Sequence, residues 1–184
     1  MTWMMTSSHM PDLLPESLFW FFRGFTVSEA KEWQAYSFYA VDAQRWKNHG
    51  FTPAEASEWK QRFTSSEATS WRDVGFLPGE AIEWKQYQFT PVEAARWRGA
   101  GFWRAEANRW AARGIPVHEA KLWSDAGFFA EEVEPWRSRG FSPPDAAAWD
   151  ELYVPPPIAK VCVAAGYTIE QARREIEPKP WEDT

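Results

Sequence analysis

Aromatic, small and polar residues follow one another along this chain in a pattern that returns about every 13 residues. The clearest mark of the pattern is a tryptophan column, in which one slightly shorter step interrupts an otherwise constant spacing. The column comprises Trp20, Trp33, Trp46, Trp59, Trp71, Trp84, Trp97, Trp110, Trp123, Trp136 and Trp149. A fixed period of this kind is the signature of a repeat array. We therefore expect each period to form one structural unit.

One repeat has the start and stop signals of a single short helix. In the repeat that begins at Gly50, Thr52 is a helix-capping residue and Pro53 suits the first helical position, where its missing N–H is not needed. Glu55 follows the cap by three residues and can complete a capping box. The helix should stop at the glycine of the next repeat, because glycine readily adopts the left-handed backbone that ends helices.

Three columns of the repeat, numbered from its glycine as position 1, supply the predicted core. Position 2 is aromatic or apolar, position 7 is nearly always alanine, and position 10 is the tryptophan. Positions 7 and 10 share a helix face because they are three residues apart. One such helix buries too little apolar surface to offset the ordering of its own residues, so neighbouring repeats must stack. The predicted core residues are Trp33, Trp46, Trp59, Trp71, Trp84, Trp97, Trp110, Trp123, Trp136 and Trp149.

These signals predict an all-α fold, a solenoid or superhelix of about 12–13 short single-helix tandem repeats with a 13-residue period. We expect a mobile tail over residues 1–10, a single helical-repeat domain over residues 11–177, and a second tail over residues 178–184. The domain divides into an atypical first repeat (11–23), regular repeats (24–152) and C-terminal capping repeats (153–177). In the capping repeats, Cys162 and Glu175 occupy the tryptophan column.

Some repeats depart from the pattern at the cap or inside the helix. The cap residue is replaced by Tyr39, Leu77, Trp103, Pro116 and Phe129. Pro135 falls inside a predicted helix, where it removes a backbone hydrogen bond, so that helix should be kinked or shortened.

Composition narrows the class of protein. The chain has 184 residues and a net charge of −6, which argues mildly against nonspecific binding of nucleic acid. Its single cysteine excludes an internal disulfide framework and any multi-cysteine metal site. We find neither a secretory signal nor a stretch of transmembrane length, and we expect a cytoplasmic protein without membrane contact.

No group of residues in the sequence indicates catalysis. The histidines are His9, His49 and His118, which lie far apart in the repeat, and no metal-binding spacing connects them. The acidic column at position 6 is explained by helix capping and by the helix dipole. We therefore predict a protein that is not an enzyme and has no cofactor and no metal site.

A basic column at position 11 is the first candidate binding surface. It comprises Lys47, Lys60, Arg72, Lys85, Arg98 and Arg137. Cations near the end of a helix stabilise its dipole, which is the simpler interpretation. Alternatively, the column forms a basic stripe that recognises an acidic protein segment or a polyanion.

The first helix is the second candidate, because it is apolar nearly all round. By register, Trp20 faces inward, and Phe21 and Phe22 fall where later repeats carry polar residues. Phe19 belongs to the same apolar run and is a candidate with them. Either the N-terminal tail covers them or they form a surface for docking or self-association.

We therefore expect a non-enzymatic helical-repeat scaffold that mediates protein–protein interaction or assembly. Two alternatives remain open at this point: a polyanion- or nucleic-acid-binding repeat protein that uses the basic column, and a self-assembling structural subunit.

Overall fold

The computed structural model describes residues 15–176, and the secondary structure within that range is α-helical throughout. The predicted tails over residues 1–10 and 178–184, with His9, lie outside the described residues. The helices are α1 (Glu16–Phe21), α2 (Val27–Ala35), α3 (Ala40–Asn48), α4 (Pro53–Trp59), α5 (Ser65–Asp73), α6 (Pro78–Gln86), α7 (Pro91–Gly99), α8 (Arg104–Ala112), α9 (Val117–Asp125), α10 (Val133–Arg137), α11 (Pro143–Asp150), α12 (Pro156–Ala164) and α13 (Ile169–Ile176). The prediction of an all-α helical-repeat fold is confirmed.

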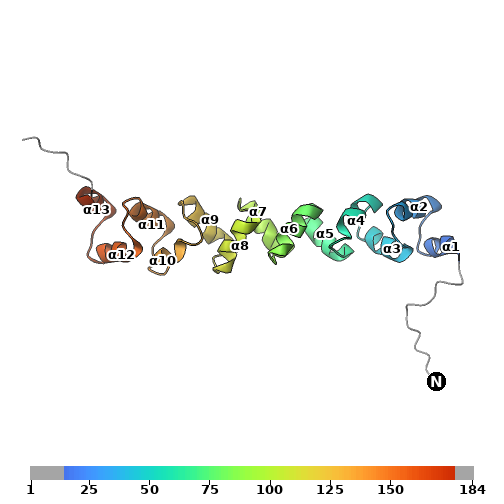
Figure 1. The fold of residues 1–184 in the computed structure, drawn as a ribbon, viewed down its shortest axis with the longest axis horizontal. Helices are drawn as coiled ribbons and strands as arrows, with labels where there is room; N and C mark the ends of the chain where they lie inside the picture. Colours follow the sequence, from blue (N-terminus) through green and yellow to red (C-terminus); the bar gives the residue numbers. More distant parts are fainter. Residues whose placement is uncertain (1–14, 177–184) are drawn as a thin grey trace, which may run out of the picture. The chain divides into compact units, whose positions relative to one another are not determined.

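The described helices fall into two compact units that divide between Lys85 and Gln86. In the first unit α1 packs against α2, α2 against α3, α3 against α4, and α4 against α5 (Figure 1). In the second unit α7 packs against α8, α8 against α9, and α11 against α12. Helix α10 also contacts α12, so helices two repeats apart meet as well.

Capping boxes begin several of the helices, α2, α4, α5 and α7 among them. At α4 the backbone amide of Glu55 donates to the Thr52 hydroxyl at 3.3 Å, and the Thr52 amide donates to the Glu55 carboxylate at 2.8 Å. Two backbone donors that the helix itself cannot satisfy are thereby bonded. The threonine and glutamate columns therefore define where these helices start.

A left-handed residue ends most of the described helices, and the apolar residue that follows it folds back. At the end of α3, Gly50 has φ +74°, and the amide of Phe51 donates to the Trp46 carbonyl at 3.1 Å. The shorter step before Phe63 has no left-handed residue, and three other repeats have no glycine at this point, where Ser37, Gln88 and Tyr153 adopt positive φ instead. This conformation is strained for side chains other than glycine. Packing of the apolar residue that follows therefore outweighs local preference in these repeats.

The core of each unit is built from tryptophan, phenylalanine and alanine. The Phe38 ring lies 5.0 Å from the Trp33 ring and 6.5 Å from the Trp46 ring, edge to face with both. Such pairs contribute beyond the area they bury. The alanines between them, Ala43 and Ala56 among others, have no exposed surface. All ten tryptophans of the predicted core are buried.

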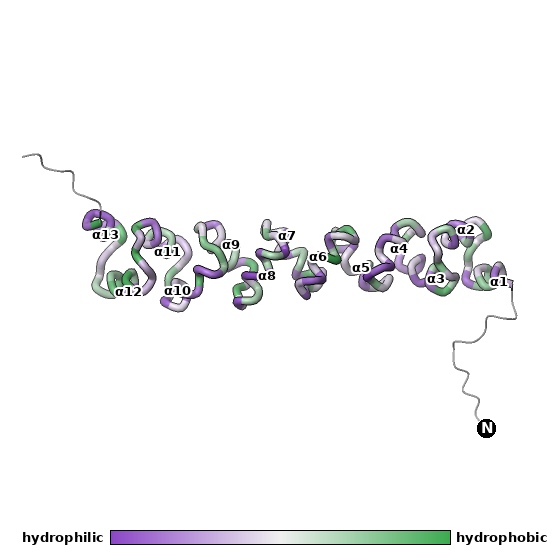
Figure 2. The backbone as a smooth tube through the Cα atoms, viewed as in Figure 1, coloured by the Kyte–Doolittle hydropathy of each residue, from purple (hydrophilic) through white to green (hydrophobic). Residues whose placement is uncertain are grey.

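Two regions depart from this regular packing. Helix α10 is reduced to five residues, and the buried Val133 replaces the alanine of position 7. Pro135 lies inside it and has no amide to donate, which accounts for the short helix. Helix α12 is largely hydrophobic (Figure 2), yet its tryptophan position holds the half-buried Cys162.

Candidate functional site

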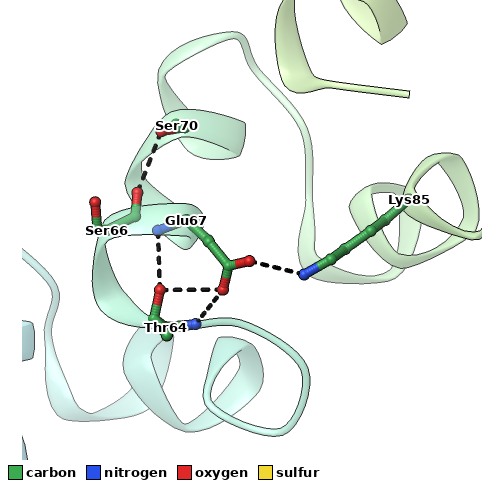
Figure 3. A network of polar contacts seen from close by, with 5 residues as sticks. All are labelled: Thr64, Ser66, Glu67, Ser70 and Lys85. Carbon is green, nitrogen blue, oxygen red and sulfur yellow. Dashed lines mark hydrogen bonds and ion pairs between the residues drawn. The ribbon is translucent and has the colours of Figure 1, made fainter. Parts of the chain in front are cut away.

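The basic column reaches backwards to the preceding helix. The Lys47 ammonium lies 2.7 Å from the Glu29 carboxylate, and Lys85 lies 2.9 Å from Glu67. Figure 3 shows Lys85 joining the capping box of α5 from α6. In the second unit, the Arg137 guanidinium donates two hydrogen bonds to Glu119, at 2.7 and 3.2 Å. The acidic residue stands 18 residues before the cation in each pair.

Two members of the column bind backbone carbonyls instead of a carboxylate. Lys60 donates to the carbonyl of Tyr36 at 2.7 Å, and Arg72 donates to the carbonyl of His49 at 2.8 Å. These carbonyls end α2 and α3, two helices before the cation. A helix C-terminus carries partial negative charge, so a cation is stabilised there.

The same cations cover the phenylalanine that precedes the neighbouring helix. Lys60 lies 4.1 Å from the centre of the Phe38 ring, and Arg72 lies 3.9 Å from that of Phe51. Lys47 and Lys85 cover Phe25 and Phe63 in the same way, at 4.6 and 4.7 Å. A cation over an aromatic face is attracted to the ring. In α3 to α6 the basic column therefore ties consecutive repeats together.

The titration of the acidic column reflects these contacts. Hydrogen bonds from Lys47 and from the backbone and hydroxyl of Thr26 lower the pKa of Glu29 to about 2. The pKa of Glu67 is lowered by the Thr64 backbone and by Lys85. The hydrogen bonds and charge of Glu119 raise the pKa of Arg137. The carboxylates thus stay ionised and available to the cations.

Five members of the basic column each reach another repeat of the chain. The remaining member, Arg98, is exposed in the last turn of α7 and also takes part in an interaction. The helix-dipole interpretation of the sequence places each cation only at the end of its own helix, and it does not predict the contact between repeats. The constant offset between the acidic and basic columns was the signal that could have revealed it.

Helix α1 exposes two of its three candidate aromatics. Phe21 and Phe22 are 68% and 69% exposed, and their ring centres lie 6.0 Å apart. Phe19 is half-buried, and the Arg23 guanidinium lies 4.6 Å from its ring centre. Trp20 is buried, as the register predicts. Phe21 and Phe22 therefore form an apolar patch at the start of the described chain.

A second set of exposed apolar side chains occupies the cap position, where the sequence pattern alone shows only departures from the repeat. Tyr39 is 78% exposed and Trp103 is 74% exposed, and Leu77 and Phe129 are also exposed. Neither Tyr39 nor Trp103 makes a side-chain capping hydrogen bond. These side chains are exposed to solvent at the position where, in other repeats, a threonine hydroxyl accepts a hydrogen bond from the first turn of the helix.

Residues 15–176 contain no group of three or more histidine, cysteine, aspartate or glutamate side chains that could hold a metal ion. His49 contacts the Arg45 carbonyl at 2.8 Å, and His118 is exposed at the start of α9. None of the described helices is long and apolar enough to cross a membrane.

Comparison with known proteins finds no matching family model, no matching curated protein and no matching solved structure. The surfaces of the chain itself are therefore the basis for a functional proposal.

Proposed function

We propose that the protein is a non-enzymatic helical-repeat scaffold that binds another protein through exposed aromatic side chains at the starts of its helices. The observation that supports this proposal is the exposure of Trp103 and Phe129 at the cap position. We call these two residues the cap-position surface. Aromatic residues of this kind are enriched among the side chains that dominate protein–protein binding.

The local energetics favour threonine at this position, so the aromatic side chains require another explanation. Losing a capping hydroxyl costs about 1 kcal/mol of helix stability. Exposed apolar groups add no compensating burial within the chain. When such groups gather on one side of a protein, they commonly mark an interaction surface.

The two residues belong to helices that lie close together in the second unit. Trp103 precedes α8 and Phe129 precedes α10 by a short turn. The Arg113 guanidinium, at the end of α8, lies 3.2 Å from the Glu131 carboxylate in that turn. The end of α8 therefore lies beside the turn that carries Phe129, and Trp103 stands at the other end of the same helix, about 13 Å away. One extended protein segment that runs along α8 can contact both aromatic side chains.

Cap restoration provides the test. Replacing Trp103 and Phe129 with threonine should abolish capture of the partner from an extract of the host cell. The same change should raise the free energy of unfolding by about 1 kcal/mol, because Trp103 is the N-cap of α8 and threonine supplies a capping hydroxyl there, whereas the N-cap of α10 is Glu132 and not Phe129. Tyr39→Thr is the matched control in the first unit and should leave capture unchanged. If the double variant captures the same proteins in the same amounts as the wild type, the proposal is wrong.

Two alternative functions, polyanion or nucleic-acid binding and self-assembly, concern other surfaces of the chain. A polyanion-binding function would need free cations, whereas five members of the basic column contact the chain itself. Self-assembly concerns a different surface, at α1. Cytoplasmic location remains part of this proposal, and imaging of a fluorescent fusion in the host cell would test it.

A further inference from the structure

Helix α1 departs from the later helices at position 11. In α3 to α6 the cation at this position reaches back to an earlier repeat, as Lys47 of α3 does to Glu29 and Phe25. In α1 the position holds Phe21, and no described residue lies where a preceding repeat would be. An aromatic residue therefore stands where a cation would meet a neighbouring repeat, and it is exposed.

A groove lies beside Phe21, between α1 and α2. Its volume is about 640 Å³, and its apolar lining includes Trp20, Phe21, Phe25, Val27 and Ala30. Ala30 is 9% exposed, whereas the equivalent alanines from α3 to α9 have no exposed surface. The groove therefore opens where a preceding helix would cover position 7.

We infer that this surface packs against the same surface of a second copy of the chain. A symmetric dimer requires a patch that is complementary to itself. Phe22 projects into water beside a groove that can receive an aromatic ring. A two-fold axis places the phenylalanine of each copy opposite the groove of the other, so a single patch supplies both halves of the contact.

The charges on the groove have the same self-complementarity. Glu16 and Lys31 both line it, and within residues 15–176 neither forms an ion pair. Glu16 accepts one hydrogen bond, from the Gln34 side chain at 3.1 Å. The two-fold axis that exchanges the phenylalanines can bring Glu16 of each copy to Lys31 of the other.

The size of the patch indicates how strong the dimer is. Phe21 and Phe22 expose roughly 100–150 Å² each, and Leu18 and Val27 bring the apolar area to roughly 400 Å² per copy. Stable interfaces bury roughly 800 Å² per partner. The dimer is therefore weak and depends on concentration. It does not depend on the cap-position surface, so this inference and the proposed function stand or fall separately.

Sedimentation equilibrium of the full chain tests the dimer between roughly 5 and 500 μM, a range that covers weak association. The wild type should move from monomer to dimer across this range. The combined substitutions Phe21→Lys and Phe22→Gln should raise the dissociation constant at least tenfold. Leu122→Lys with Ile158→Gln makes the same kind of change at two other exposed apolar side chains, in α9 and α12, and should leave the dimer unchanged.

Charge exchange separates a second copy from any other occupant of the groove. Lys31→Glu alone should weaken the dimer by apposing two acidic side chains, and adding Glu16→Lys should restore it. Residues 1–14 of the same chain, or a different protein, could also cover the patch; either would leave the chain monomeric at all concentrations. A monomer at roughly 500 μM, or a dimer that survives the two phenylalanine substitutions, overturns the inference.

Discussion

Basic side chains cover the phenylalanine of every repeat from α2 to α5, whereas the last described helices have no such cover. Lys47, Lys60, Arg72 and Lys85 lie over Phe25, Phe38, Phe51 and Phe63, and all four rings are buried. In α12 and α13 the same position holds Val163 and Ile176. Their counterparts Phe141 and Val154 are only half-buried.

The tryptophan column ends in the same region. Cys162 and Glu175 take its place in α12 and α13, yet the alanines Ala159 and Ala172 are still buried and both helices form. Close approach of neighbouring helices therefore continues after the large side chains are lost. The comparison separates two contributions: the aromatic column fills the core, and in α3 to α6 the basic column covers the phenylalanine of an earlier repeat.

The largest expected effect comes from removing an aromatic residue where the column is complete. Trp71→Ala should lower the free energy of unfolding by about 3–5 kcal/mol, because a large buried side chain leaves a cavity. Cys162→Ala, at the same repeat position in α12, should cost about 1 kcal/mol or less, since little volume is removed. Urea denaturation measures both changes. Equal losses would show that the two regions have equivalent cores.

A smaller loss is expected from reversing the basic column of the first unit. Replacing Lys60, Arg72 and Lys85 with glutamate removes three cation–aromatic contacts and their hydrogen bonds. We expect a loss of about 2–3 kcal/mol, since each exposed contact contributes up to about 1 kcal/mol. Glutamate at Arg62, Arg109 and Lys160 makes the same charge change away from these contacts, and should cost about 0.5 kcal/mol or less per site. If the two triple variants are equally stable, the column does not join the repeats.

The sequence alone did not predict these cation contacts between repeats. The helix starts at Thr26, Thr52 and Thr64 and the buried tryptophans follow from spacing within one repeat, which is local information. The hydrogen-bond acceptor of each cation depends instead on how three successive helices are placed in space. Lys60 keeps the usual column offset from Asp42, but aspartate is one methylene shorter than glutamate and Asp42 pairs with Arg45 at 3.2 Å. Lys60 therefore bonds the carbonyl of Tyr36 instead.

The exposed surfaces were predicted only in part for a similar reason. Phe21 and Phe22 stood out because consecutive aromatic residues cannot all face one neighbour. The residues that replace the cap, such as Trp103, appeared only as local exceptions. Their exposure depends on how the turn before each helix is packed, and spacing along the chain does not report that.

The smallest expected effect is a gain of stability when a cation is added to the C-terminal region. In Val163→Lys the new cation stands 18 residues after Asp145, the same separation as between Glu29 and Lys47. From this position the lysine can cover the half-buried Phe141. We expect the free energy of unfolding to rise by about 0.5–1 kcal/mol. Ala164→Lys places the same charge one residue further along α12 and should bring no gain. A gain from both substitutions would point to net charge rather than cover of the ring.

The most direct test of the tie between repeats is the titration of Glu29, followed by the NMR signal of its side-chain carboxyl carbon. The pKa of Glu29 is lowered from its ordinary value of 4.5 to about 2, first by the hydrogen bond from Lys47. A lowered carboxyl pKa means that this contact stabilises the fold above about pH 4.5 and that the stabilisation is lost as pH falls towards 2. We predict a midpoint near 2 in the wild type and a higher midpoint in Lys47→Met, in which the hydrogen bonds from Thr26 remain. A midpoint at 4.5 in the wild type, or one that Lys47→Met does not move, would contradict the account.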